Sequence, residues 1–216
     1  VLLHRYTNQT DIIVGCPIAG RNHADLEDQI GFYINTIALR DQVQGETPFE
    51  AFLEQVKRTA TEAYDHQVYP FDRLVDELKL SRDVSRSPMF DTMVVLQNAK
   101  TANDSLEKIR ISPFIEEYGV SKFDLGFTFE EKEDGLEVAL VYNTDLFLTE
   151  RIQRIGHHFQ KLVTSILEDA GQPLGQLKIL PEAERRQLLN EFNPDTDYSC
   201  DKTIVDLFEE QAGKTP

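Results

Sequence analysis

Basic residues are scarce in this chain relative to acidic ones. Its 216 residues include 22 Lys and Arg against 38 Asp and Glu, which gives a formal net charge of −16 at pH 7. Proteins that bind nucleic-acid backbones neutralise phosphates with patches of Lys and Arg. No such run occurs here, so the composition argues against a nucleic-acid partner and predicts a soluble protein with an acidic surface.

Cysteine is also rare, since only Cys16 and Cys200 occur. Two cysteines so far apart form neither a disulfide framework nor the ligand spacing of a metal site. Cys16 lies in an apolar segment, where a free thiol behaves as a small hydrophobic group. We therefore expect no metal centre.

Long apolar runs are absent, and the N-terminus lacks the pattern of a signal peptide. These absences predict no membrane partner and a cytoplasmic location. The sequence also contains no Gly-rich phosphate loop and no nucleophile elbow. Nucleotide phosphate binding and serine hydrolase chemistry are therefore not supported.

The apolar periodicities that are present predict an α/β (α+β) sandwich. Strands are expected near 12–18, 34–39, 89–96, 108–115, 123–130 and 136–142. Helices are expected near 48–66, from Pro70 to Leu78, and from Thr149 onward. The first has a capping box in Thr47–Glu50, and Thr149 is expected to cap the last. The last helix has an apolar stripe formed by Ile152, Ile155, Phe159, Leu162, Val163 and Ile166.

The segment Gly31–Arg40 is the most informative one. Its apolar residues would normally make a buried strand: Phe32, Ile34, Ile37 and Leu39. Asn35 and Thr36 interrupt this run, and buried polar groups need hydrogen-bond partners. We expect both residues to line a cleft or tunnel; a hydrogen bond that closes local backbone geometry is the alternative.

Four ordered segments resemble motifs of the condensation domains of nonribosomal peptide synthetases. They are Asp11–Arg21, Gly31–Arg40, His66–Phe71 and Arg82–Met89. The resemblance implies a lobe of the chloramphenicol-acetyltransferase-like fold. It also implies an amide-forming acyltransferase as the activity of the complete domain.

The family's catalytic His-His-x-x-x-Asp-Gly motif is absent from the chain. The pair His157–His158 lacks the following Asp-Gly and lies downstream of the other motifs, whereas the family motif precedes them. Adjacent residues also point to different faces of a helix, so we expect packed or surface roles for this pair. The resemblance therefore implies a C-terminal lobe whose N-terminal lobe lies upstream, and an inactive isolated fragment.

Arg21 is the main candidate for active-site support. By resemblance, it matches an Arg that pairs with the Asp of the absent motif; an exposed Arg near Asp25 or Glu27 is the alternative. An Arg fork can grip a carboxylate through two hydrogen bonds.

Structural roles are expected for the remaining motif residues, which are His66, Pro70, Arg82, Arg86 and Pro88. The two arginines are expected to hold Asp72, Asp76 or Glu77, or to brace the cleft.

Composition changes after about Leu180 divide the chain into three parts. By resemblance, these parts are expected to be a condensation-domain C-terminal lobe at 1–180, a linker at 181–202 and the start of an adenylation domain at 203–216. The resemblance implies four partners, namely the N-terminal lobe, donor and acceptor peptidyl carrier proteins, and a downstream adenylation domain. Phosphopantetheine would arrive on the carriers, so the lobe itself would bind no cofactor.

Three other functions remain open at this stage. One is a non-catalytic carrier-protein interaction or docking module, which would fit a chain without the N-terminal lobe. The others are a related epimerisation or cyclisation domain and a stand-alone acyltransferase. Ile34–Thr36 and Arg40 favour condensation over epimerisation or cyclisation, and the tail disfavours a stand-alone enzyme.

Overall fold

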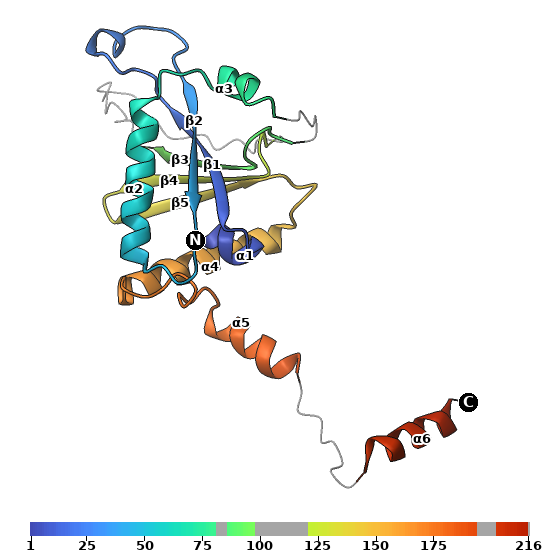
Figure 1. Ribbon diagram of the computed structural model, residues 1–216. Coiled ribbons are helices and arrows are strands. Elements are labelled where there is room, and N and C mark those ends of the chain that lie inside the picture. Colours follow the sequence, from blue (N-terminus) through green and yellow to red (C-terminus); the bar gives the residue numbers. More distant parts are fainter. Residues whose placement is uncertain (81–85, 98–120, 194–201, 216) are drawn as a thin grey trace, which may run out of the picture. The chain divides into compact units, whose positions relative to one another are not determined.

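A computed structural model of the chain describes residues 1–80, 86–97, 121–193 and 202–215. The chain consists of two compact units, Val1–Ile179 and Leu180–Pro216. The first unit contains a five-stranded sheet with helices packed against it (Figure 1). Its elements are α1 (Leu2–Thr7), β1 (Asp11–Ile18), η1 (Ala24–Leu26), β2 (Asn35–Gln42), α2 (Phe49–Asp65), α3 (Phe71–Glu77), β3 (Thr92–Gln97), β4 (Leu125–Lys132), β5 (Gly135–Tyr142) and α4 (Thr149–Glu168). The strand expected near 108–115 falls outside the described residues.

The sheet is mixed, with strand order β2-β1-β3-β4-β5. Its two outer pairs, β1–β2 and β4–β5, are antiparallel, whereas β3 runs parallel to both β1 and β4. Parallel neighbours need long crossover connections, and α2 and α3 lie in the one between β2 and β3. A tight turn before Gly135 joins β4 to β5, and Gly135 has a φ of 156°, which favours glycine. The expectation of a mixed α/β architecture is therefore confirmed.

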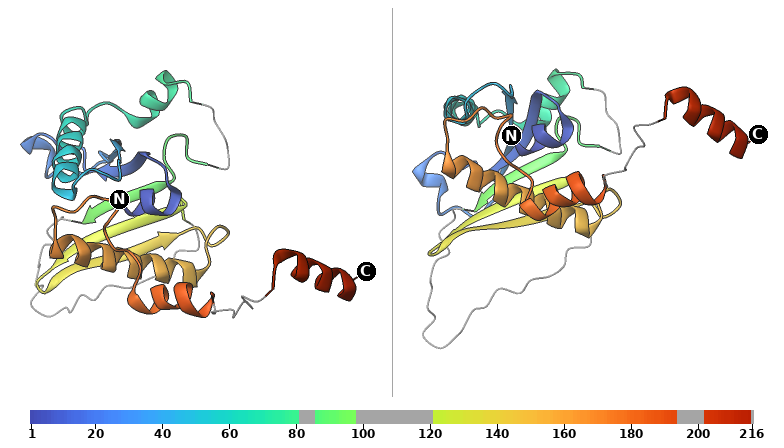
Figure 2. Two further views of the ribbon diagram at one scale, coloured as in Figure 1. Left: turned by 60° about the horizontal axis from the view of Figure 1, so that its bottom comes forward. Right: turned by 90° about the horizontal axis from the view of Figure 1, so that it is seen from below.

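One face of the sheet builds the core against α4, which Figures 1 and 2 show running along β4 and β5. Phe127 and Phe129 of β4 both meet Phe159 of α4, at ring-centroid distances of 6.3 and 5.7 Å. The predicted stripe is confirmed for the helix residues that are buried or packed against the core, namely Ile152, Ile155, Phe159, Leu162 and Ile166. Val163 is the exception, because it is 36% exposed at the stripe's edge.

The N-terminus of α2 is satisfied by backbone rather than by the predicted capping box. Pro48 occupies the cap position without a side-chain hydrogen bond. The N–H groups of Phe49 and Glu50 donate to the carbonyls of Gln172 and Ala170, at 3.0 and 3.1 Å. Capping by the Thr47 side chain was thus a wrong prediction, because a segment far along the chain supplies the acceptors.

The predicted cap of α4 was also wrong. Leu148 is at the cap position, and Thr149 is already the first helical residue. The Thr149 hydroxyl instead lies 2.9 Å from the hydroxyl of Tyr142 at the end of β5. This contact joins the end of the last strand to the start of α4.

The other face of the sheet has a group of small side chains beside larger ones such as Ile13, Met93 and Val141. Strand alternation and pairing place these residues together: Gly15, Pro17, Thr36, Ala38, Gly126, Thr128 and Ala139. The ring of Phe90 packs directly over Gly15, where an added Cβ would lie 2.2 Å from a ring carbon. Phe90 also packs against Phe71, the first residue of α3, with the rings tilted and their centroids 5.5 Å apart. Gly15 therefore makes room for the chain leading into β3.

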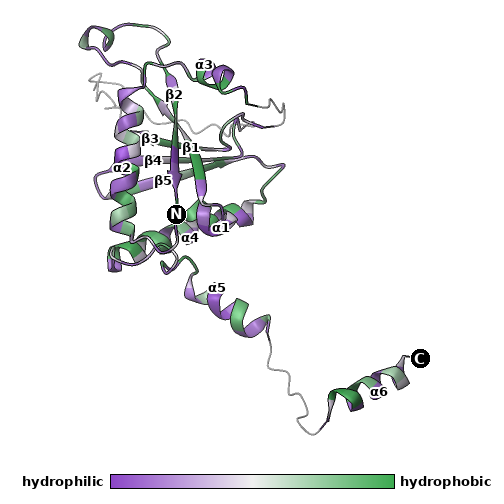
Figure 3. Ribbon diagram, in the orientation of Figure 1, coloured by the Kyte–Doolittle hydropathy of each residue, from purple (hydrophilic) through white to green (hydrophobic). Residues whose placement is uncertain are grey.

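The second unit contains α5 (Glu182–Arg186), a short π-helix η2 (Gln187–Glu191) and α6 (Ile204–Lys214). Thr203 caps α6 in a reciprocal capping box with Asp206. The apolar residues Ile204 and Phe208 are 86% and 73% exposed, and the first turn of α6 is the apolar (green) part of this helix in Figure 3. α6 is therefore a short helix with apolar residues exposed in its first turns.

Within the described parts of the chain, no helix combines the length and the apolar character needed to cross a membrane.

Candidate functional site

Arg21 lies in the loop that leaves the C-terminal end of β1 and returns to the start of β2. Its guanidinium donates to the carbonyl oxygen of Leu26 and, at 3.5 Å, to that of Gly31. The guanidinium carbon also lies 4.4 Å from the ring centroid of Tyr33. Three parts of one loop therefore hold this side chain, which is itself half-buried.

Neither Asp25 nor Glu27 pairs with Arg21, so the alternative expectation of a local surface ion pair was wrong. Asp25 instead lies 3.4 Å from Nδ1 of His23. Among the described residues, no carboxylate comes within 4.0 Å of the Arg21 guanidinium. Because a guanidinium has five N–H donors and two are used here, three remain for a group outside this part of the chain.

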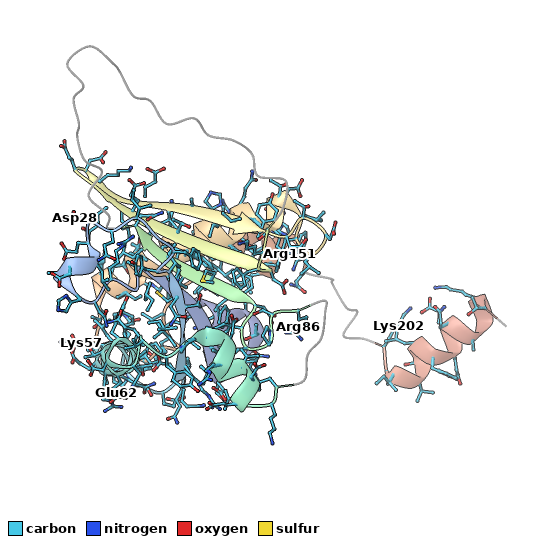
Figure 4. All side chains as sticks on the ribbon, turned by 90° about the horizontal axis from the view of Figure 1, so that it is seen from above. Asp28, Lys57, Glu62, Arg86, Arg151 and Lys202 are labelled. Atoms are coloured by element: carbon cyan, nitrogen blue, oxygen red, sulfur yellow. The ribbon has the colours of Figure 1, made fainter. Side chains whose placement is uncertain are left out.

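The loop folds tightly on itself at Gly20 and Tyr33. Gly20 has a φ of 65°, and a Cβ added there would lie 1.9 Å from the carbonyl oxygen of Tyr33. The Tyr33 hydroxyl donates to Oε1 of Gln29 at 2.8 Å. The ring of Tyr33 is thus fixed at its backbone and at its hydroxyl. Asp28 of the same loop is labelled in Figure 4.

The apolar residues around Tyr33 point outward, contrary to the prediction of a buried strand. Ile30, Phe32 and Ile34 are 105%, 89% and 58% exposed. The reason is that β2 begins only at Asn35, so the preceding residues belong to the loop. Within the strand itself Ile37 is buried, as predicted.

Asn35 joins the start of β2 to the connection between α2 and α3. Its Nδ2 donates to the carbonyls of Gln67 and Tyr69, at 2.9 and 2.8 Å. Its Oδ1 accepts from the backbone N–H of Phe71 at 3.2 Å, which caps α3. Both donor hydrogens of the amide are therefore used on the connection between α2 and α3, which is distant from Asn35 in the sequence.

Thr36 differs from Asn35 because it lies on the small-residue face of the sheet. It pairs across the strands with Pro17, close to the end of β1 from which Arg21 follows. A cleft bounded by this face would have Thr36 in its wall; the lining role of both residues remains a prediction.

His66 and Pro70 bracket the turn between α2 and α3. His66 is the C-cap residue of α2, and its backbone N–H donates to Ala63 O at 3.2 Å, while its side chain is exposed. Pro70 has a φ of −65° and occupies the N-cap position of α3. Both residues therefore lie at helix ends, and their structural roles remain predictions.

Arg86 forms an ion pair with Asp91. Its Nε lies 3.4 Å from Asp91 Oδ1, and its Nη2 donates to Oδ2, which makes a two-pronged pair. Arg86 lies on the chain leading into β3, and Figure 4 labels it. The expected contact of Arg86 with Asp72, Asp76 or Glu77, or its bracing of the cleft, remains a prediction. Arg82 lies outside the described residues.

Pro88 is exposed on the same approach to β3, consistent with a role in the entry to the strand.

Asp124 lies beside this ion pair and was not singled out by the sequence. Burial, then the nearby Asp91 carboxylate, raises the pKa of Asp124 above its ordinary value, while Arg86 opposes the shift. All three side chains border a cavity of about 370 Å³ that also includes Lys122 and Asn143. The positive charge of Arg86 partly neutralises the neighbouring carboxylates of Asp91 and Asp124.

His158 is buried in α4, and His157 beside it is exposed. The Tyr6 hydroxyl lies 2.5 Å from Nδ1 of His158 and connects α1 to α4. The expected packed and surface roles fit these positions. Among the described residues, no group of three or more His, Cys, Asp or Glu side chains is arranged to hold a metal ion.

Comparisons with known proteins give a consistent picture. A family model described as a condensation domain matches residues 1–189. The chain is 44% identical over 217 residues to tyrocidine synthase 3 of Brevibacillus parabrevis, and 42% identical over 216 residues to bacitracin synthase 3 of Bacillus licheniformis. Each alignment takes in the whole chain but only 3% of the synthetase.

Solved structures share the fold as well. The X-domain from teicoplanin biosynthesis superposes with a TM-score of 0.74 at 25% identity, over 83% of this chain and 42% of that chain. A holo four-domain nonribosomal peptide synthetase bound to AMP and glycine gives a TM-score of 0.80 at 21% identity, over 99% of this chain and 17% of that one.

Proposed function

Because this chain belongs to the condensation-domain family, we propose that residues 1–180 form the C-terminal lobe of a condensation domain. Residues 181–202 would be a linker, and residues 203–216 the start of an adenylation domain. Two findings support this division. The family model ends at residue 189, whereas the synthetase relatives align over the whole chain. The chain also covers only 42% of the X-domain chain, as one lobe of a two-lobe domain would.

In this proposal, the complete domain forms an amide bond between two carrier-bound substrates. The amine of an aminoacyl acceptor thioester attacks the carbonyl of an acyl or peptidyl donor thioester, and the donor carrier's thiol leaves. The product remains on the acceptor carrier. Phosphopantetheine comes with the donor and acceptor carrier proteins, and this lobe binds no cofactor of its own. Such chemistry requires a positioned carbonyl and amine above all.

Arg21 would act by orientation, through a carboxylate of the N-terminal lobe. The observation that carries this role is its guanidinium, which is anchored by the loop and retains three N–H donors. A bidentate pair with the Asp of the other lobe's His-His-x-x-x-Asp-Gly motif would fix the loop that holds the catalytic His. Arg21 itself would transfer no proton. Thr36, on the small-residue face, would contribute to the wall of the substrate tunnel.

The decisive experiment compares the complete condensation domain with its Arg21→Ala variant. Both are incubated with loaded donor and acceptor carriers, and dipeptidyl thioester is measured by mass spectrometry. We expect the variant to remain folded and to lose most of its condensation rate. The 216-residue chain alone should give no product above a no-protein control. Near-normal condensation by folded Arg21→Ala would refute the role of Arg21, and product from the chain alone would refute the half-site proposal.

Downstream, α6 supports the proposed connection to an adenylation domain. Its capping box makes it a well-defined helix, yet Ile204, Leu207 and Phe208 are exposed. Exposed apolar residues on one helix commonly mark an interface. In the complete synthetase they would pack against the adenylation domain that follows.

A non-catalytic interaction module is a second candidate, because one similar solved structure is a complex of the X-domain with OxyB from teicoplanin biosynthesis. The chain is 26% identical to that X-domain, well below its identity to the peptide synthetases. The same carrier assay separates these functions. A complete domain that binds loaded carriers without forming the amide would favour the interaction module, and a product with inverted donor stereochemistry but no new amide would indicate epimerisation.

A further inference from the structure

We propose that Tyr33 is a positioning residue for the condensation reaction and acts by holding the guanidinium of Arg21 in one orientation. This inference rests on the proposed role of Arg21. It assigns to Tyr33 a function that the sequence did not indicate, because twelve positions and a loop separate the two residues.

The contact between the two side chains restricts the guanidinium in a specific way. The Tyr33 ring covers one side of it at 4.4 Å, within the range of a cation–π interaction. Two of the Arg21 N–H groups point to the carbonyls of Leu26 and Gly31. Ring and carbonyls together leave the guanidinium little freedom to rotate, so its remaining donors face a constant direction. Preorganisation of this kind matters most where a group must meet its partner in a single geometry.

Tyr33 is suited to this task because its own position is fixed. Its carbonyl packs against Gly20, the residue immediately before Arg21, and its hydroxyl donates to Gln29. Its neighbours Phe32 and Ile34 are exposed, whereas Tyr33 is only partly exposed and turns toward Arg21. The ring face contacts the guanidinium, and the hydroxyl does not. An aromatic ring, rather than a tyrosine as such, is therefore the required feature.

The test uses the complete synthetase module with loaded carriers and compares Tyr33→Leu, Tyr33→Phe and Tyr33→Trp. We expect Tyr33→Leu to lower kcat by roughly fivefold, the size of one partly exposed cation–π contact, with little change in KM for the carriers. Tyr33→Phe and Tyr33→Trp should stay within about twofold of the parent, because both retain the ring face. If Tyr33→Leu does not fold, the Tyr33→Phe and Tyr33→Trp rates still decide whether the ring suffices.

A double-mutant comparison with Arg21→Lys shows whether Tyr33 acts through Arg21. Lysine keeps the charge but lacks the planar fork. In the Arg21→Lys background, Tyr33→Leu should therefore lower kcat little further. Tyr142→Leu, a Tyr substitution at the far end of the sheet, should lower thermal stability and leave kcat unchanged. These two results together would distinguish positioning from a general loss of stability.

Each part of the inference can be overturned separately. A full rate loss in Tyr33→Phe, or equal effects of Tyr33→Leu with and without Arg21→Lys, would refute the positioning role. If Arg21→Ala abolishes condensation while folded Tyr33→Leu is fully active, the inference fails and the proposed function stands. If Arg21→Ala itself is fully active, the proposed role of Arg21 fails, and the inference fails with it.

Discussion

The side-chain oxygen of Asn35 accepts a hydrogen bond of 3.2 Å from the backbone N–H of Phe71. This contact links the first residue of β2 to the first residue of α3. The same amide donates to two carbonyls just before Pro70, so one side chain fixes the path of the chain around the edge of the sheet. The geometry therefore assigns Asn35 a structural role that would also hold the neighbouring Thr36 in place.

Replacing Asn35 should therefore be costly. Asn35→Ala removes the partner of one backbone N–H and two carbonyls, and we expect a loss of about 1–3 kcal/mol in the free energy of unfolding. Asn35→Asp keeps the acceptor for Phe71 but loses both donors, so it should also destabilise. Urea unfolding measures both effects. Gln67→Ala, which leaves the accepting carbonyl unchanged, is the matched control; an equal loss there would contradict the assignment.

Tyr6 and His158 provide a test of the histidine pair. Tyr6→Phe removes a hydroxyl that lies 2.5 Å from the His158 ring, and we expect a loss of about 1 kcal/mol in stability. His157→Ala, on the exposed side of α4, should change stability by less than about 0.5 kcal/mol. Neither variant should change the condensation rate of the complete folded domain. A large rate loss with His157→Ala would mean that the pair has a chemical role after all.

The regular elements were predictable because their signals are local. The apolar repeat of α4 and the apolar run of β1 are determined by residues close together in sequence, and the structure places these elements as expected. The predictions that failed concerned contacts between distant segments. The cap of α2 is one example, since its acceptors belong to residues 170 and 172.

In the candidate site, too, local sequence signals were predictable and contacts between distant segments were not. Arg21 stood out in the sequence because of its place after a buried strand and within a family-like motif. Its contact with Tyr33 depends on how the intervening loop folds, and no periodicity encodes that. Asp124 was missed for a related reason: only the fold brings it beside Asp91 and Arg86.

Asp124 should make stability depend on pH. Since folding raises the pKa of this carboxyl above its unfolded value of about 3.9, the folded state favours the protonated form. The contribution of protonated Asp124 to the free energy of unfolding is present below about pH 3.9 and is lost as the pH rises through the folded-state pKa. Asp124→Asn mimics the protonated group, so it should stabilise the protein at neutral pH, with a gain that fades on acidification.

Urea unfolding between pH 3.5 and pH 7.5, a range spanning roughly the carboxyl titration, measures this gain. Asp145→Asn, at an exposed carboxyl in the loop between β5 and α4, is the matched control and should shift stability by less than about 0.5 kcal/mol. A gain from Asp124→Asn that grows as the pH falls would show that the sign of the shift is wrong.

Gly20 tests whether the loop around Arg21 has the fold described. Its φ of 65° disfavours any residue with a Cβ, and that atom would lie 1.9 Å from the Tyr33 carbonyl oxygen. Gly20→Ala must therefore push Tyr33 away, and we expect at least about 1 kcal/mol of lost stability. The displaced ring would also release Arg21, so the complete domain should condense more slowly even where it stays folded. Gly45→Ala is the matched control, because an added Cβ there meets only ordinary contact at 3.9 Å. A Gly20→Ala variant as stable and as active as Gly45→Ala would mean that the loop does not pack Tyr33 against the backbone at Gly20.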